Sequence, residues 1–333
     1  MGVLQYIGKR IGLYIVVLFI GLTVTFLLPR FMPANPIEAY ISQLQSRANG
    51  TLTPEAIADM RTNLEELYGL KGDLLSQYIN YIKRIVTRFD FGTSFAYYPQ
   101  PVNSMILSAL PWTLGLLLIS TFVAWILGNL VGLVAGYFHT KRSAAVLELV
   151  GILLYPIPYY ILAVSLILLL AYVIPIFPLS PTFPVGQMTP TKFGMVLYNS
   201  LLPALTIVLA GFGWNILSMK ALAIATTEEP YVTYARLKGT SNGTRMFSYV
   251  FRNAMLPQVT ALALSLGTVF NGAILTEILF SYPGVGLIMR TAASSGDYNV
   301  LYGAIAISII AVATAGLIID LIYPLLDPRI RHR

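Results

Sequence analysis

The residues able to carry out bond chemistry are few in this chain and do not cluster. The sequence contains no cysteine, which excludes disulfides, thiol catalysis and cysteine-ligated iron–sulfur clusters. Its two histidines, His139 and His332, are far apart and lie outside the long apolar runs, so a histidine-rich metal site is not expected. In the one Gly-Lys pair, Gly8-Lys9, Val3 replaces the first glycine of a phosphate-binding loop, which argues against bound nucleotide. We expect no catalytic residue, no metal and no cofactor on this chain.

Apolar residues dominate the chain and occur in long runs. Of the 333 residues, 56% are hydrophobic and only 11% are charged, whereas a soluble domain carries about a quarter charged residues. A helix needs roughly 20 apolar residues to cross a hydrocarbon core about 30 Å thick. We therefore predict an all-α polytopic membrane protein with six transmembrane helices. Their expected bounds are Ile11–Leu28, Leu110–Tyr137, Val146–Ile174, Leu201–Ala223, Ala254–Leu279 and Val300–Tyr323.

Two of these runs admit another interpretation. The third contains Pro156 and Pro158, which remove two backbone donors. We interpret this run as one kinked span rather than as two spans. The first follows Lys9 and Arg10 and could be a signal peptide, but no small-residue cleavage site follows it closely. We therefore retain it as a span.

The distribution of positive charge predicts the orientation. Lysine and arginine residues near span ends accumulate on the cytoplasmic side of a membrane. Six spans place both termini on one side, which would carry twelve such residues, against Lys192 and Arg290 on the other. The twelve are Lys9, Arg10, Lys141, Arg142, Lys220, Arg236, Lys238, Arg245, Arg252, Arg329, Arg331 and Arg333. We expect both termini to be cytoplasmic, and this accounts for the net charge of +7 without nucleic acid.

Two outer connections are long enough to form structure outside the bilayer. Residues 29–105 are expected to be a small helical cap, with one helix opening at Thr53 and Pro54 and an amphipathic second helix over Leu74–Val86. The loop 175–192 contains five prolines and is expected to be stiff and extended.

The cytoplasmic connection 224–253 carries the clearest local pattern. Thr226 and Glu229 have the spacing of a capping box, and Pro230 suits a first helical turn. Gly239 is expected to end a helix of about ten residues. By physical chemistry alone this helix could be an interfacial connector anchored by lipid headgroups.

Several stretches resemble the permeases of ATP-binding cassette (ABC) importers. Tyr231-Val-Thr-Tyr-Ala-Arg-Leu-Lys-Gly239, followed by Arg252-Asn-Ala-Met-Leu-Pro257, looks like the EAA loop of the dipeptide/oligopeptide/nickel branch. Residues 272–286, 327–333 and 89–94 agree with the same branch, so the resemblance covers essentially the whole chain. It is to the first, B-type, of two permease subunits. Thr233 stands where the wider superfamily has the glutamate of the EAA motif, as is usual in this branch.

The resemblance implies a fold and a location. The fold is the type I ABC importer permease (MetI-like) fold with a helical external segment after the first span, in the plasma (inner) membrane. The implied divisions are the N-terminal tip and first span (1–28), the external segment (29–105), the five-helix core (106–326) with its coupling loop (224–253), and a cytoplasmic tail (327–333).

The resemblance also implies partners. These are a second homologous permease, two ATPase subunits that bind ATP and Mg, an external substrate-binding protein and membrane lipid. Closure of the ATPases would move the loop helix and thereby the spans. The resemblance assigns ATPase coupling to Glu229, Tyr231, Thr233, Tyr234, Ala235, Arg236, Lys238 and Gly239. The external segment is expected to contact the binding protein or to cap the pathway.

Other residues are candidates for packing and for the pathway. Gly128, Gly132 and Gly136 recur every fourth residue on the second span, a spacing that predicts close helix packing. Polar groups in hydrocarbon are expected to face the protein interior. The candidates for lining the substrate path are Tyr155, Tyr159, Thr268 and Asn271, and those for an outer gate are Glu277, Tyr282, Pro283 and Gly284. A structural salt bridge is the alternative for Glu277.

The expected function is the permease subunit of an ABC importer for di- or oligopeptides, and not an enzyme. Members of this branch also carry oligosaccharides, such as cello-oligosaccharides, or nickel chelates, and the sequence has no readable selectivity filter. A stand-alone secondary transporter would need coupling-ion carboxylates near the membrane midplane, which the sequence lacks. A membrane enzyme would need a nucleophile paired with a base, and the sequence shows no such set.

Overall fold

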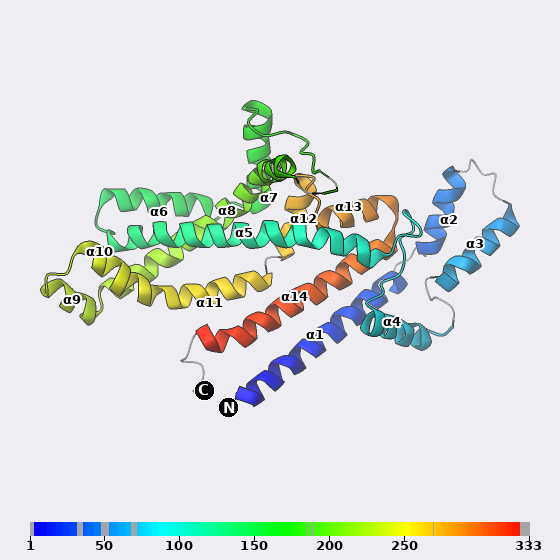
Figure 1. The fold of residues 1–333 in the computed structure, drawn as a ribbon, viewed down its shortest axis with the longest axis horizontal. Coiled ribbons are helices and arrows are strands. Elements are labelled where there is room, and N and C mark those ends of the chain that lie inside the picture. The colour runs from blue at the N-terminus through cyan, green and yellow to red at the C-terminus, as the bar shows by residue number, and fades with distance from the viewer. Residues whose placement is uncertain are drawn as a thin grey trace. The chain divides into compact units, whose positions relative to one another are not determined.

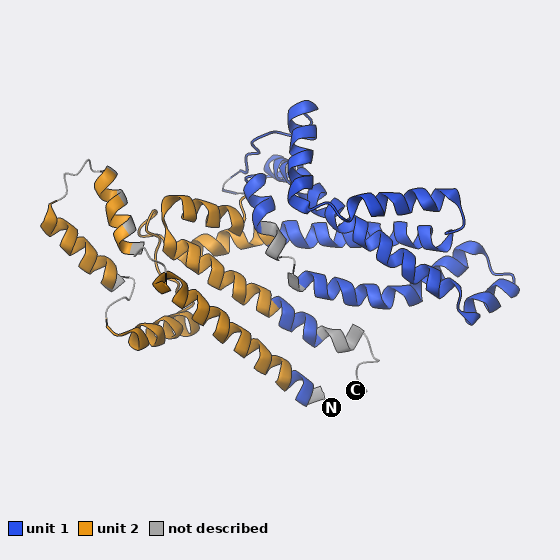
Figure 2. Cartoon of the chain, turned by 180° about the vertical axis from the view of Figure 1, so that it is seen from behind, with its two compact units in different colours: residues 1–7, 114–282, 315–333 blue, residues 8–113, 283–314 orange. Residues whose placement is uncertain are grey.

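The structure, a computed structural model, describes residues 3–31, 36–47, 53–67, 72–184, 186–187, 189–268 and 270–326. These residues are almost entirely helical (Figure 1), and the one β contact among them is an isolated bridge between Thr93 and Pro101. The chain divides into two compact units, coloured separately in Figure 2. Unit 1 comprises residues 1–7, 114–282 and 315–333, and unit 2 comprises residues 8–113 and 283–314.

Four helices in the described part of the chain are long and apolar enough to cross a membrane. They are α1 (Val3–Phe31), α5 (Val102–Tyr137), α8 (Pro190–Thr227) and α14 (Tyr298–Leu326). They coincide with the first, second, fourth and sixth predicted spans but are longer. Helix α8 begins at Pro190, inside the loop expected to be extended, because Thr189 caps it by accepting a hydrogen bond from the Lys192 amide.

The third predicted span is interrupted in the structure. Helix α6 (Arg142–Leu154) is followed by α7 (Tyr159–Ile167) and the π-helix η1 (Leu168–Val173), with a bend of 98° between α6 and the α7–η1 stretch. The predicted kink is therefore a complete break, because residues 155–158, which include Pro156 and Pro158, are not helical. The fifth run contains α11 (Arg252–Thr268) and α12 (Phe270–Leu279), on either side of residue 269, which lies outside the described residues. Six uninterrupted spans are thus not found among the described residues.

The glycines of α5 form its contact with α8 in unit 1. A Cβ atom on Gly132 would lie 2.6 Å from the Ile216 carbonyl oxygen, and one on Gly136 would lie 2.6 Å from the Lys220 carbonyl oxygen. A Cβ atom on Gly128 would lie 2.5 Å from the Asn215 Cβ. These distances are too short for any larger side chain, so the two backbones touch along three successive turns.

Unit 2 contains α2 (Pro36–Arg47), α3 (Pro54–Leu67), α4 (Leu74–Arg88) and α13 (Val285–Ser295). The predicted helix at Pro54 is confirmed, with the Thr53 hydroxyl accepting from the Ala56 amide. Helix α4 is also confirmed, and the Asp73 carboxylate caps it through Ser76, a contact that lowers the pKa of this carboxyl. The core of the unit includes Ile85, Phe91, Val102, Ile106 and Val300.

A buried carboxylate joins two parts of unit 2. Asp297, only 1% exposed, precedes α14 and accepts from the Val300 amide at 3.2 Å. Its other oxygen accepts from the Ala96 amide at 3.0 Å and from the Ser94 hydroxyl. The charge is therefore compensated by three donors, which fix residues 94–96 against the start of α14.

Replacing this carboxylate is expected to destabilise unit 2. Asp297→Ala removes a helix cap and leaves buried donors unsatisfied, which together cost about 2–4 kcal/mol. The loss is measured as a lower midpoint of thermal unfolding in detergent, together with faster proteolysis between residues 89 and 101. Asp59→Ala, at an exposed carboxylate on α3, is the control and should leave both unchanged. Equal stability of the two variants would contradict this assignment.

Candidate functional site

The 224–253 connection folds around α9, a short helix over Pro230–Leu237. The predicted capping box is wrong, because α8 continues to Thr227 and the Thr226 hydroxyl donates to the Leu222 carbonyl instead. Glu229 is the extended residue before the helix, and its side chain makes no capping hydrogen bond. The start of α9 is therefore determined by Pro230, whose missing donor is not needed in a first turn.

Gly239 ends α9 as predicted. It has a φ of +74°, which L side chains rarely adopt. The Gly239 amide donates to the Arg236 carbonyl at 3.0 Å, and the Thr240 amide donates to the Ala235 carbonyl at 3.3 Å. These two hydrogen bonds form a Schellman motif. The Thr240 hydroxyl also donates to the Ala235 carbonyl, at 2.7 Å.

A substitution at Gly239 should loosen this end of α9 through the backbone alone. A Cβ atom there would meet nothing within 4 Å, so the cost of Gly239→Val comes from the positive φ and is about 1–2 kcal/mol. We expect the amides of residue 239 and Thr240 to exchange hydrogen about 5–30 times faster. Gly243→Val is the matched control, since Gly243 has equally open space and no positive φ. Unchanged exchange in the Gly239 variant would contradict the role given to this residue.

One side of α9 is anchored in the core of unit 1. Val232 and Ala235 are buried. Val232 belongs to a cluster with Leu133 of α5, Met219 of α8 and Ala254 of α11. Val232 of the short helix α9 therefore packs against three longer helices in one buried cluster.

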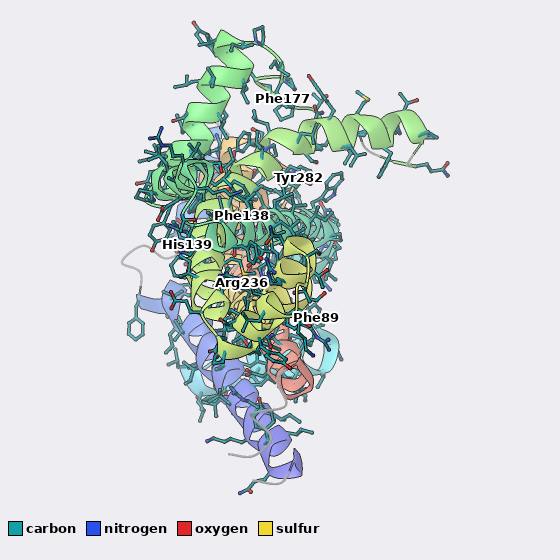
Figure 3. The ribbon with its side chains drawn as sticks, turned by 90° about the vertical axis from the view of Figure 1, so that its left-hand side faces the viewer. Phe89, Phe138, His139, Phe177, Arg236 and Tyr282 are labelled. Atoms are coloured by element: carbon teal, nitrogen blue, oxygen red, sulfur yellow. The ribbon has the colours of Figure 1, made fainter. Side chains whose placement is uncertain are left out.

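The other side of α9 is exposed and combines apolar, aromatic and basic groups. Leu237 is 80% exposed, and the Lys238 ammonium lies 4.9 Å from the centre of the exposed Tyr234 ring. Burial and, to a lesser extent, the Glu229 carboxylate raise the pKa of the Tyr231 phenol, so it is neutral at physiological pH. Exposed predicted coupling residues are Glu229, Tyr231, Thr233, Tyr234, Arg236 (labelled in Figure 3), Lys238 and Gly239. Ala235 instead faces the core.

Arg245 was not singled out from the sequence, although it holds the loop together. Its guanidinium donates to the Thr240 carbonyl at 2.6 Å, to the Tyr137 hydroxyl at 3.3 Å and to the Asn242 side chain. It lies at the start of the π-helix η2 (Arg245–Phe251) that leads into α11. The contact joins the end of α9 to the end of α5, which fixes the position of the short helix.

A cavity of about 300 Å³ lies within unit 1. Its lining includes Trp125 of α5, Tyr159 of α7, Trp214 and Asn215 of α8, and Ser265 of α11. The Trp125 indole donates to the Gln258 carbonyl at 3.0 Å, which fixes one wall of the cavity. An aromatic wall with a few polar groups is typical of a small-molecule cavity.

Of the four predicted pathway residues, one lines this cavity, one does not, and the side chains of the other two are not described. Tyr159 lines this cavity, whereas the Tyr155 ring packs at a tilt against the Trp214 ring, with ring centres 5.5 Å apart. Thr268 ends α11 and Asn271 is in α12, but their side chains lie outside the described residues. Trp125 and Trp214 were missed as lining residues. Tryptophans usually prefer the membrane interface, so their position in the middle of two predicted spans is a sequence feature that could have identified them.

Two of the four predicted gate residues are buried in unit 1. Glu277 is fully buried, and its backbone carbonyl accepts from the Tyr282 amide at 2.8 Å. The Tyr282 ring packs on Phe183 with ring centres 5.0 Å apart, and its oxygen lies 3.4 Å from the Ser200 hydroxyl oxygen. Pro283 and Gly284 belong to unit 2, where Gly284 precedes α13.

Known proteins resemble the chain over almost its entire length. It is 26% identical to the dipeptide transport system permease protein DppB of Lactococcus lactis, over 98% of this chain and 99% of that protein. It is 28% identical to the dipeptide transport system permease protein DppB of Bacillus subtilis, over 98% of each chain. It is also 28% identical to the metal-staphylopine import system permease protein CntB of Staphylococcus aureus, again over 98% of each.

The family match lies over the part of the chain that contains α9 and most of the residues that line the cavity. Residues 128–332 match the model of the binding-protein-dependent transport system inner membrane component. The match covers more than half of the chain and agrees with its long apolar helices. The chain therefore belongs to the family of inner membrane components of binding-protein-dependent transport systems.

Proposed function

We propose that this chain is one of two permease subunits of an ATP-driven importer for di- or oligopeptides. The main support for the proposal is that α9 has one buried and one exposed side. Val232 packs on one side against α5, α8 and α11, and Tyr234 and Leu237 are exposed on the other. An exposed leucine beside an exposed tyrosine on a rigid short helix suits contact with another protein. The relatives named for dipeptide transport support the substrate class.

In this proposal α9 contacts an ATPase subunit. Two ATPases bind ATP and Mg, and their closure displaces α9 together with α5, α8 and α11. The movement changes the cavity lined by Trp125 and Trp214, which forms this chain's part of the pathway. Substrate arrives from a binding protein that contacts residues 29–105. The chain itself carries no ATP site.

The proposal includes a topology. The α6 and α7–η1 stretches complete one crossing, and α11 with α12 completes another, so that the chain crosses the inner membrane six times. Both termini and α9 are then cytoplasmic, which agrees with the twelve lysine and arginine residues on that side. Residues 29–105 are external.

Uptake into proteoliposomes tests the proposal. The complete transporter, with ATP inside the vesicles and its binding protein outside, is expected to accumulate a labelled dipeptide. Cello-oligosaccharides and a nickel chelate are the comparison substrates, the latter because a relative is named for metal-staphylopine import. Accumulation of a comparison substrate without any peptide would overturn the substrate class. Failure to accumulate any solute against its gradient would overturn the importer.

A further inference from the structure

The cavity of about 300 Å³ in unit 1 has no charged residue in its described lining. The lining comes from α5, α7, α8, α11 and α12, and most of it is leucine, isoleucine, alanine, glycine and aromatic residues. Residues 267–273, whose side chains lie outside the described residues, are also uncharged in the sequence. Glu277 is fully buried and does not line the cavity. A charged group that entered would therefore leave water without gaining an oppositely charged partner.

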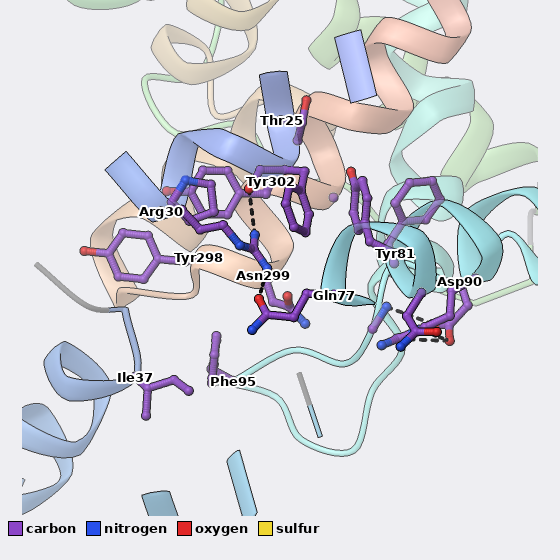
Figure 4. Close-up of a pocket in the computed structure, with 17 residues that line it drawn as sticks. Thr25, Arg30, Ile37, Gln77, Tyr81, Asp90, Phe95, Tyr298, Asn299 and Tyr302 are labelled. Atoms are coloured by element: carbon purple, nitrogen blue, oxygen red, sulfur yellow. Dashed lines mark hydrogen bonds and ion pairs between the residues drawn. The ribbon is translucent and has the colours of Figure 1, made fainter. Parts of the chain in front are cut away.

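A second cavity, of about 160 Å³ in unit 2, is lined differently (Figure 4). Arg30 and Asp90, both labelled there, belong to its lining. Asp90 pairs with the Arg84 guanidinium at 3.1 Å, and Arg30 donates to the Gln77 side chain at 2.8 Å. Charged side chains can thus line a cavity of this chain, and where they do, they bond to their neighbours. The absence of charge is a particular property of the unit 1 cavity.

Several polar donors in the unit 1 lining are already satisfied within the chain. The Trp125 indole N–H donates to the Gln258 carbonyl at 3.0 Å. The Asn215 amide and the Ser265 hydroxyl each donate to a backbone carbonyl of their own helix, at 2.9 and 2.8 Å. Because its N–H is engaged, Trp125 offers only ring carbon surface to a ligand. The cavity therefore suits an apolar group better than a polar one.

The aromatic rings of the cavity can be reached by a ligand. Trp214 is 52% exposed, and Trp125 and Tyr159 are partly exposed. A Cβ atom on Gly213 would lie 2.7 Å from the Tyr155 amide nitrogen, so α8 touches the end of α6 at this level and the Tyr155 ring backs that of Trp214. A volume of about 300 Å³ is at the lower end of the range for small-molecule cavities. It has room for one large side chain and not for a whole oligopeptide.

The aromatic rings do not make this cavity a site for a cation. An ammonium group is attracted to the face of an aromatic ring, but the attraction is smaller than the cost of removing an unpaired ammonium from water. No carboxylate is present in the described lining to offset that cost. A lysine side chain is therefore disfavoured here together with a glutamate side chain.

We propose that this cavity is a selectivity site of the permease itself, which receives an uncharged aromatic or aliphatic side chain of the transported peptide and disfavours a charged one. The inference rests on the proposed function. The side chain packs on the rings of Trp125, Tyr159 and Trp214, and the charged ends of the peptide stay outside the cavity. Such a site discriminates between peptides after the binding protein has released them.

Initial rates of uptake by the wild-type transporter test this preference. Proteoliposomes with the complete transporter and internal ATP receive a saturating amount of binding protein, preloaded with one labelled dipeptide at a time, so that affinity for the binding protein does not set the rate. Phenylalanyl-alanine is expected to enter about tenfold faster than lysyl-alanine or glutamyl-alanine. Equal rates for the three dipeptides, or a faster rate for lysyl-alanine, would overturn the proposal.

Trp214→Leu keeps an apolar side chain and removes the ring. It is expected to lower the uptake of phenylalanyl-alanine relative to alanyl-alanine about three- to tenfold. Phe193→Leu is the matched control, because Phe193 is 53% exposed on the same helix and lies outside the cavity lining. It should keep the wild-type ratio. An unchanged ratio in the Trp214 variant, or an equal change in both variants, would count against the site.

Asn215→Asp places a carboxylate in the cavity wall with little change in shape. It is expected to raise the uptake of lysyl-alanine relative to phenylalanyl-alanine by about tenfold or more, because the ammonium then has a partner. Asn253→Asp is the control: Asn253 also donates to a carbonyl of its own helix, at 2.7 Å, but is exposed outside the cavity lining. Equal ratios in these two variants would contradict the proposal.

The outcomes separate this inference from the proposed function. If the wild-type transporter takes up no dipeptide, both are overturned. If it accumulates all the dipeptides and the substitutions at Trp214 and Asn215 leave their relative rates unchanged, the peptide importer stands and the selectivity site is excluded.

Discussion

Leu237→Glu is expected to abolish ATP-driven transport while leaving the chain folded. The side chain is 80% exposed at the end of α9, so a carboxylate there costs the isolated chain little. At a contact with an ATPase subunit the same carboxylate would be buried without a partner, at a cost of about 3 kcal/mol or more. This corresponds to a loss of affinity of about 150-fold. Co-purification of the ATPase subunits and ATP-dependent uptake measure the loss.

The control for this variant is a second exposed leucine. Leu179→Glu introduces the same charge at a residue that is 60% exposed in the segment between η1 and α8. It should retain both ATPase binding and uptake. Full ATPase binding by the Leu237 variant, or an equal loss in both variants, would contradict the assignment of α9 as the contact helix.

Gly132→Val is expected to have the largest effect on stability. A Cβ atom at this position would lie 2.6 Å from the Ile216 carbonyl oxygen and 2.8 Å from the Met219 Cβ. Because one of these atoms is backbone, α8 has to move away from α5 along their contact. Overpacking of this kind costs about 3 kcal/mol or more. The expected result is a lower midpoint of thermal unfolding and loss of monodisperse protein in detergent.

Gly115→Val separates this packing effect from the general cost of valine in a helix. Gly115 is on the same helix, and a Cβ atom there would meet nothing within 4 Å. Valine has a higher helix propensity than glycine, so this variant should be as stable as the wild type or slightly more stable. An equal loss of stability in the two variants would show that the close contact of α5 with α8 does not determine the effect of Gly132→Val.

Long apolar runs predicted the helices that depend on local sequence. Helices α1, α5, α8 and α14 could be located because a run of about twenty apolar residues specifies a membrane helix without reference to the rest of the chain. Pro156 and Pro158 marked the break in the third run, but the 98° bend depends on how α6 and α7 each pack against α8. Such an angle is a tertiary property and cannot be read from spacing.

The site shows the same division between local and long-range features. Gly239 and Pro230 were predicted as the ends of a short helix because their backbone preferences are local. The role of Arg245 was missed because it bonds both Tyr137 and Thr240. These two residues are distant in sequence, so their proximity could not be predicted from local patterns. The predicted capping box does not form because Thr226 lies within α8, where its hydroxyl donates to the Leu222 carbonyl.

The central claim is that transport is driven by ATPase subunits acting on α9. Its most direct test is uptake of labelled dipeptide into proteoliposomes that contain the two permeases with or without the ATPase subunits, with ATP inside and the binding protein outside. Accumulation against the gradient is expected only when the ATPases are present. Accumulation by the permeases alone, or by this chain alone, would contradict it.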